Sequence, residues 1–283
     1  MPELPEVETT RRGVEPWVTG RSISEIRVHQ TSLRWPVECP PSLVGATIRG
    51  VLRRGKYLLF RFDAGTLIVH LGMSGSLRIM PEDAERLKHD HFELIFQHGS
   101  ATKSLRLNDP RRFGCVLFQP GSDPESHALL NRLGVEPLGN EFSGEGLFQL
   151  SRNRKVAVKN FIMDSKVVVG VGNIYAAESL FLAGIRPTVP AGRVSKVGYE
   201  HLSRAIRRVL TDAVTQGGTT LRDFVGSDGQ PGYFKQSLYV YGREKEPCKL
   251  CNSTLRMLNI GNRSSVFCPQ CQRRSGFVPP IEY

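Results

Sequence analysis

Residues 51–71 read VLRRGKYLLFRFDAGTLIVHL, in which two runs rich in Val, Ile, Leu and Phe are separated by Asp-Ala-Gly. Such runs, bounded by Gly and Asp, predict β-strands joined by turns. Similar apolar runs follow at residues 92–96 and 115–118. The pattern predicts a β-rich domain that extends from about residue 21 to residue 118.

Apolar positions recur at helical spacing on both sides of this region. Residues 7–18 predict a helix that would fix the N-terminus near the surface of the β-rich domain. Residues 137–146 are rich in Gly and predict a linker. Beyond it, helical periodicity recurs over residues 144–150, 156–163, 174–183 and 199–216. The second domain is therefore expected to be mainly helical.

The composition is that of a folded protein with excess positive charge. Its 283 residues suffice for two domains with separate cores. Lys and Arg number 38 against 27 Asp and Glu, and the net charge of +11 favours a polyanionic partner, either nucleic acid or an anionic membrane surface. A basic enzyme without such a partner is the alternative. The N-terminal segment is acidic and no stretch approaches ~18 uninterrupted apolar residues, so we expect an intracellular protein without a membrane span.

Four of the six cysteines form two Cys-x-x-Cys pairs, Cys248 with Cys251 and Cys268 with Cys271, separated by 16 residues. This spacing is typical of zinc held by four thiolates on two knuckles, which leave no open position for catalysis. We therefore expect one structural zinc ion in a C-terminal hairpin. Arg263 would lie at the turn of this hairpin, where it could reach a phosphate.

The N-terminus carries a second chemical signal. Removal of Met1, which a small second residue permits, would leave Pro2 as a free secondary amine beside the carboxylate of Glu3. A secondary amine that adds to an aldehyde carbon gives a cationic iminium, as in amine-based covalent catalysis, and Glu3 could then move protons. The alternative, from these residues alone, is an ordinary frayed terminus.

Other residues fit a nucleic-acid partner. Basic residues cluster around Lys56, Arg111 and Lys159, and such clusters could neutralise phosphates. A Gly-rich turn precedes Asn173 at the start of a predicted helix, whose N-terminal amides could hold a phosphate. Met73 lies between glycines in what should be a loop, as a possible apolar wedge between bases. The alternatives are that the basic clusters are ordinary solvated surface and that Met73 packs in the core.

Collinear motifs extend over nearly the whole chain: PELPEVET at residues 2–9, RRGKYLL at 53–59, HLGMSGSLR at 70–78, KHDH at 88–91, DPRRFG at 109–114, MDSKVVVGVGNIYAAESLFLAGI at 163–185, QGGTTLRDF at 216–224, SDGQPGYF at 227–234, VYGR at 240–243 and the cysteine hairpin. In these motifs the chain closely resembles the bacterial formamidopyrimidine-DNA glycosylases. The resemblance implies an α+β multidomain fold: an N-terminal β-sandwich flanked by helices, a helix–two-turn–helix domain and a zinc-finger β-hairpin, with double-stranded DNA in the cleft between the domains.

The resemblance implies base-excision repair of oxidised purines by a monomer in the bacterial cytoplasm. Pro2 would attack C1′ of the damaged nucleotide, and β- and δ-elimination would then nick the strand. Glu3 would assist opening of the sugar ring, and Glu6 would support the amine. Two further catalytic residues carried over from the family, Lys56 and Arg263, would contact phosphates of the DNA. The family's DNA ligands correspond to His89, Arg111, Arg112, Lys159, Asn173 and Tyr241. The residues that would fill the space left by the base are Met73, Arg111 and Phe113.

The expected domains are a catalytic β-sandwich at 1–136, a linker with the start of the helical domain at 137–150, a helix–two-turn–helix domain at 151–240 with a lesion loop at about 217–233, a zinc finger at 241–272 and a tail at 273–283. Two alternatives stay open. The related endonuclease VIII group removes oxidised pyrimidines and resembles Pro-Glu-Gly-Pro-Glu at its start, whereas this chain has Leu4. A catalytically silent DNA-damage binder would keep the zinc hairpin without needing a free Pro2.

Overall fold

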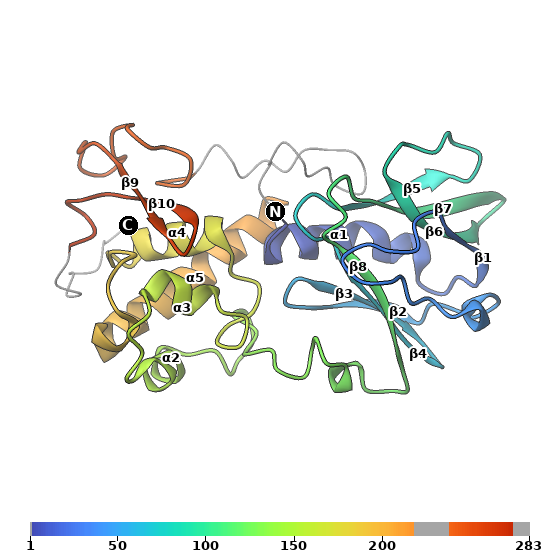
Figure 1. Ribbon diagram of the computed structural model, residues 1–283, viewed down its shortest axis with the longest axis horizontal. Helices are drawn as coiled ribbons and strands as arrows, with labels where there is room; N and C mark the ends of the chain where they lie inside the picture. The colour runs from blue at the N-terminus through green and yellow to red at the C-terminus, as the bar shows by residue number, and fades with distance from the viewer. Residues whose placement is uncertain (1, 218–237, 274–283) are drawn as a thin grey trace. The chain divides into compact units, whose positions relative to one another are not determined.

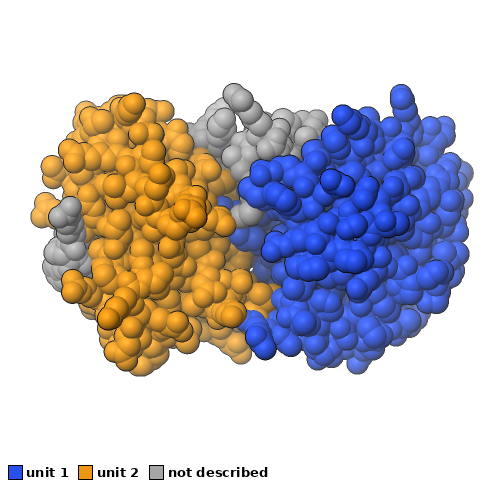
Figure 2. All heavy atoms as spheres, in the orientation of Figure 1, with its two compact units in different colours: residues 1–132, 216–235 blue, residues 133–215, 236–283 orange. Residues whose placement is uncertain are grey.

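The computed structural model describes residues 2–217 and 238–273. The chain divides into two compact units, residues 1–132 with 216–235 and residues 133–215 with 236–283, which Figure 2 colours separately. This division lies close to the boundary predicted near residue 136. Most of the predicted lesion loop and all but the first residue of the predicted tail lie outside the described residues.

In its described part, the first unit holds two four-stranded antiparallel sheets (Figure 1). One sheet has the order β1 (Ile23–Val28), β6 (Asp90–His98), β7 (Ala101–Asn108) and β5 (Ser76–Pro81). The other has the order β2 (Gly50–Arg54), β3 (Tyr57–Phe62), β4 (Gly65–His70) and β8 (Cys115–Pro120). The apolar runs of the sequence therefore correspond to strands of both sheets.

One apolar core joins the two sheets to the first helix. Phe60 of β3 and Phe96 of β6 belong to the same buried cluster as Val7 and Val14 of α1 (Leu4–Val18). Two short 3-10 segments, η1 (Pro41–Leu43) and η2 (Pro124–Ser126), complete the helical elements described in this unit. The predicted β-sandwich with flanking helical segments is confirmed.

The second unit is mainly helical, as predicted. It contains α2 (Gly144–Ser151), α3 (Val158–Met163), α4 (Asn173–Leu182), η3 (Ala191–Arg193) and α5 (Lys196–Thr215), and then a hairpin of β9 (Arg256–Ile260) and β10 (Arg263–Phe267). Gly217, with a φ of 80°, lies just beyond the end of α5, and only Gly adopts this conformation without strain. No helix in the described ranges has the length and apolar character needed to cross a membrane.

Replacement of Phe60 by Ala should destabilise the first unit strongly. Phe60 is 0% exposed at the junction of the two sheets and α1, so its removal leaves a cavity that costs about 3–5 kcal/mol of unfolding free energy. Urea unfolding of the full chain measures this cost. Leu52→Ala, on the neighbouring strand at 53% exposure, is the control and should change the free energy by less than about 0.5 kcal/mol. Equal effects would contradict the assignment of this core.

Candidate nucleic-acid interface and metal centre

Pro2 lies directly before Glu3, the N-cap of α1, and two buried carboxylates follow it. Glu3 is the N-cap of the helix, and its backbone N–H donates to Glu6 Oε2 at 2.8 Å. Glu3 is 1% exposed and Glu6 is 0% exposed. Because the bonded N–H belongs to the peptide between Pro2 and Glu3, Glu6 fixes the backbone next to the candidate nucleophile. The capping-box geometry thus holds the terminus in place.

Lys56 lies at the tip of the β2–β3 hairpin. Gly55 and Lys56 form the two-residue connection between the paired residues Arg54 and Tyr57, and Gly55 has a φ of 58°, as the first residue of such tight turns commonly requires. Burial, together with the nearby charges of Lys56 and Arg34, lowers the pKa of His70 to about 4. His70 is therefore neutral near pH 7, and the Lys56 ammonium lies within electrostatic reach of it.

Met73 and Phe113 are large apolar side chains in exposed loops, 36% and 43% exposed respectively. The backbones of these two loops are in close contact, because a Cβ added to Gly72 would lie 2.5 Å from Gly114 N. The Arg111 guanidinium lies 5.0 Å from the centre of the Phe113 ring, within cation–π distance. The structure therefore brings together Met73, Arg111 and Phe113, the predicted space-filling residues.

Asp109 joins these two loops, and the sequence assigned it no role. It is 0% exposed, its Oδ2 accepts the Gly114 N–H at 2.8 Å, and its Oδ1 accepts the Ser74 hydroxyl at 3.3 Å. Its own N–H donates to the His89 carbonyl at 3.0 Å. The exposed Arg112, with a φ of 55°, lies in the same turn. Asp109 thus bonds the Met73 loop, the Phe113 loop and the backbone of His89 to one another.

In the second unit, Arg263 follows a two-residue turn at the tip of the zinc hairpin. Gly261 and Asn262 both have positive φ, 56° and 61°, which is the geometry of a type I′ turn. Arg263 is exposed and its guanidinium has no hydrogen bond or ion pair within residues 2–217 and 238–273. The prediction that Arg263 lies at the hairpin turn is confirmed, and its guanidinium is available to an anion.

Two other predicted DNA ligands donate to the strand that carries Arg263. Lys159 Nζ donates to the Ser264 carbonyl at 3.0 Å and to Ser265 Oγ at 2.5 Å, and Asn173 Nδ2 donates to the same carbonyl at 3.3 Å. Lys159 is 1% exposed. In this structure its ammonium therefore supports β10, and a direct contact of Lys159 with DNA stays a prediction.

Tyr241 is positioned by Glu178 of α4, another residue that sequence reasoning did not single out. The Glu178 carboxylate accepts the backbone N–H groups of Tyr239, Val240 and Tyr241 at 2.7–2.9 Å. Burial raises the pKa of Glu178, and the three backbone donors oppose that shift. A glutamate inside a predicted helix gives no sign in the sequence that it binds the segment leading to the hairpin.

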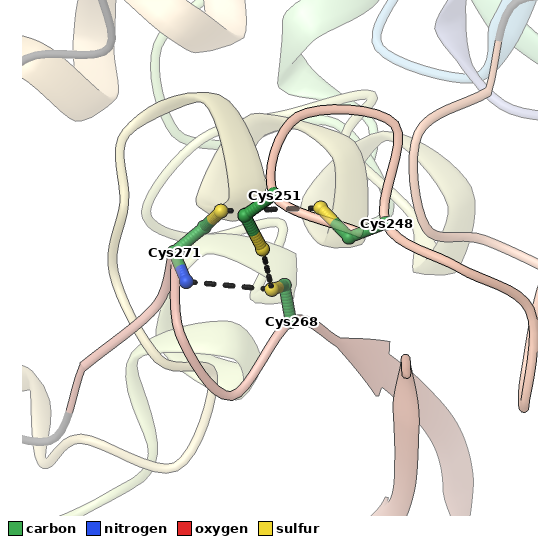
Figure 3. A group of neighbouring side chains, drawn as sticks. All are labelled: Cys248, Cys251, Cys268 and Cys271. Carbon is green, nitrogen blue, oxygen red and sulfur yellow. Dashed lines mark hydrogen bonds between the residues drawn. The ribbon is translucent and has the colours of Figure 1, made fainter. Parts of the chain in front are cut away.

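The four predicted zinc cysteines converge at the base of the hairpin (Figure 3). Their sulfur atoms all lie within 4.8 Å of one another, with Cys251 and Cys268 Sγ 3.4 Å apart and Cys248 and Cys271 Sγ 3.9 Å apart. A tetrahedron with Zn–S bonds of ~2.3 Å has sulfur atoms ~3.8 Å apart, so this donor set fits zinc. Four thiolates complete the coordination, and the zinc is therefore structural.

Comparison with known proteins identifies the family. Three family models match: the formamidopyrimidine-DNA glycosylase N-terminal domain over residues 1–116, the formamidopyrimidine-DNA glycosylase H2TH domain over residues 133–225, and a zinc finger found in FPG and IleRS over residues 245–274. The chain belongs to the formamidopyrimidine-DNA glycosylase family. The α+β multidomain fold and the single structural zinc predicted from the sequence are thereby confirmed.

Individual relatives are similar to this chain over nearly its whole length. The formamidopyrimidine-DNA glycosylases of Hahella chejuensis and Syntrophotalea carbinolica are 54% and 56% identical over 275 residues, which cover 96% of this chain and 100% of each relative. The structure is similar to the MutM (Fpg) protein from Thermus thermophilus, with a TM-score of 0.86, 37% identity and coverage of 96% of this chain and 98% of the other. The Lactococcus lactis Fpg in complex with DNA that contains N7-benzyl-Fapy-dG gives a TM-score of 0.87, 32% identity and coverage of 96% and 100%.

Loss of one zinc ligand should strongly weaken zinc binding. Cys268→Ser removes one of the four thiolates of this small module, so the purified protein should lose most of its one equivalent of zinc and bind DNA more weakly. Elemental analysis and a DNA-binding titration measure the two effects. Cys39→Ser, a partly buried cysteine outside the cluster, is the control. Full zinc content in the Cys268→Ser variant would refute the ligand assignment.

Replacement of Arg263 by Ala should weaken binding to all DNA sequences alike. Loss of one phosphate contact reduces the slope of log K against log salt by about one unit. The dissociation constant, measured across a salt series on lesion-bearing and undamaged duplexes, tests this expectation. Arg256→Ala changes an exposed arginine at the other end of the hairpin and is the matched control. An unchanged slope in the Arg263 variant would exclude it as a phosphate ligand.

Proposed function

We propose that this chain is a bifunctional DNA glycosylase and AP lyase that removes 8-oxoguanine and formamidopyrimidines from duplex DNA. The observation that carries the proposal is the arrangement at the start of α1, where Pro2 is followed by the buried carboxylates of Glu3 and Glu6. A proline terminus held by a capping box suits amine-based covalent catalysis better than it suits simple DNA binding.

The proposed reaction begins with removal of Met1, which frees the Pro2 nitrogen. The nitrogen lone pair attacks C1′, the bond from C1′ to the damaged base breaks, and the base leaves with a proton. Glu3 then protonates the ring oxygen as the sugar opens, and the nitrogen, having lost its proton, forms a cationic iminium with C1′. The iminium acidifies the neighbouring C–H bonds, so β- and then δ-elimination release the phosphates on both sides.

The other site residues are proposed to hold DNA in a distorted state. Extrusion of a nucleotide costs a few kcal/mol, least for a damaged pair, and phosphate contacts with an inserted wedge can offset that cost. Met73 and Phe113 would fill the vacated space, with Arg111 facing the orphaned cytosine. The remaining contacts are proposed for the phosphate or DNA ligands Lys56, His89, Arg112, Lys159, Asn173, Tyr241 and Arg263. We propose that the enzyme acts as a monomer in the bacterial cytoplasm.

A nicking assay on two lesions tests the proposal. The purified protein should cleave a duplex with 8-oxoguanine opposite cytosine much faster than one with thymine glycol. Glu3→Gln should slow strand cleavage by at least about 100-fold, because Glu3 is the proposed proton donor to the ring oxygen and a positioned proton donor contributes that much to such steps. Glu15→Gln, a partly exposed carboxylate in the last turn of the same helix, is the control. Preference for thymine glycol would instead indicate an endonuclease VIII-like enzyme, and tight binding without cleavage would indicate a silent damage binder.

A further inference from the structure

We infer that Arg53 is a positioning residue that fixes the Lys56 turn to the helix bearing Pro2, through an ion pair with Glu8. The inference rests on the proposed function, because it assumes that Lys56 contacts a phosphate beside the lesion. Its basis is a set of charged hydrogen bonds between α1 and the β2–β3 hairpin, which the reaction scheme does not otherwise use.

Arg53 forms hydrogen bonds both to α1 and to the turn of the β2–β3 hairpin. Its Nε donates to Glu8 Oε2 on α1 at 3.2 Å, and its Nη1 donates to the Gly55 carbonyl at 3.0 Å. That carbonyl belongs to the peptide bond joining Gly55 to Lys56. The planar guanidinium therefore connects the helix to the peptide that orients Lys56, and a single ammonium group lacks the forked geometry to do so.

Glu8 is held in its charged form by several guanidinium groups. Burial disfavours the charge, but hydrogen bonds from Arg11 and Arg12 and the charge of Arg53 outweigh it, so the pKa of Glu8 lies below its ordinary value. The Arg53 and Glu8 side chains are only 12% and 13% exposed. A pair shielded from solvent to this degree is screened less by salt than a surface pair.

A second connection fixes the same helix to the same hairpin. Arg11 donates to Glu8 Oε1 at 2.9 Å and to the Val51 carbonyl of β2 at 3.3 Å. Glu8 lies only two residues beyond Glu6, on the helix whose first turn holds the candidate nucleophile. The network thus fixes the spacing between the start of α1 and the hairpin tip, within one unit.

The spacing between the start of α1 and the hairpin tip matters because the rate of a catalysed reaction depends steeply on the positions of the groups involved. A displacement of about 1 Å at a reacting group can reduce the rate by about 100-fold. Lys56 lies in a two-residue turn, and Arg53 bonds the carbonyl of the peptide that leads to it. Without Arg53, the turn would retain its fold but lose the bond that holds the Gly55 carbonyl, so the phosphate contact of Lys56 would be formed less often.

A double-mutant cycle tests whether Arg53 acts through Lys56. The variants are Arg53→Gln, Lys56→Ala and the combination, measured as the single-turnover rate of strand cleavage at saturating full-length, zinc-loaded enzyme on 8-oxoguanine opposite cytosine. Arg53→Gln should slow the reaction about tenfold, and the combined variant should be no slower than Lys56→Ala alone, because non-additivity marks residues that act as a unit. Arg53→Lys should not restore the rate, because it keeps the charge but not the fork.

The control is Arg49→Gln, which breaks the exposed Arg49–Asp63 pair at the open end of the same hairpin and should leave the rate unchanged. Glu8→Gln breaks the same ion pair while leaving Arg53 in place, and it should also slow the reaction. This second variant shows whether the loss depends on the pair or on misfolding of the Arg53 variants. If Lys56→Ala slows the reaction but Arg53→Gln does not, or if the two losses multiply, the inference is wrong and the proposed function stands. If Lys56→Ala itself has no effect, the proposed role of Lys56 and the inference fall together.

Discussion

The proposed nucleophile, Pro2, can react only if its end of the chain is held in place, and the burial of α1 meets this constraint. Chain termini normally fray because few contacts oppose their entropy. Here Leu4, Val7 and Val14 are at most 1% exposed, and the valines join the cluster that also contains residues of both sheets. Pro2 therefore lies next to a helix that is anchored in the core of its unit.

The charged groups around α1 extend this constraint. Glu6 holds the peptide after Pro2, and Glu8 binds Arg53 on the adjacent hairpin. Glu6 lies in the first turn of the helix, where negative charge is favoured by the helix dipole. The apolar face of α1 thus anchors the helix in the core, and its carboxylates position Pro2 and the β2–β3 hairpin.

In the second unit, the zinc hairpin must also be held in a fixed place. The hairpin is too small for a core of its own, so four thiolates and one zinc ion add to the small buried cluster that Leu255 and Val266 form with Phe181 of α4. Lys159 and Asn173 then bond to the carbonyl of Ser264, next to Arg263. The type I′ turn then fixes the position of Arg263, because its geometry determines where the first residue of β10 lies.

Sequence patterns predicted those elements that depend on residues close together in the chain. The cysteine spacing predicted the zinc cluster, the Ile-Gly-Asn-Arg segment predicted the hairpin turn, and helical periodicity predicted α3, α4 and α5 to within a few residues. Strands β5 and β7 gave no clear apolar run, partly because charged residues are buried in this sheet. Arg106 Nε lies 3.1 Å from Glu93 Oε2, and both side chains are at most 4% exposed.

The positioning residues could not be predicted, because their partners are distant in sequence. Asp109, Glu178 and Arg53 each act through hydrogen bonds to backbone groups or to carboxylates on other elements. A charged residue in a sequence gives no indication of such partners, and only the fold brings them together. The catalytic and DNA-contact assignments came from the family resemblance, because no local pattern in the sequence decides them.

The central claim is that Pro2 is the nucleophile, and borohydride trapping tests it most directly. The purified protein, with loss of Met1 established by intact mass, is incubated with a duplex containing one 8-oxoguanine opposite cytosine, reduced, and mapped by peptide mass spectrometry. The account predicts a stable cross-link on the Pro2 nitrogen. A cross-link on a lysine, or none at all despite tight binding, would contradict it.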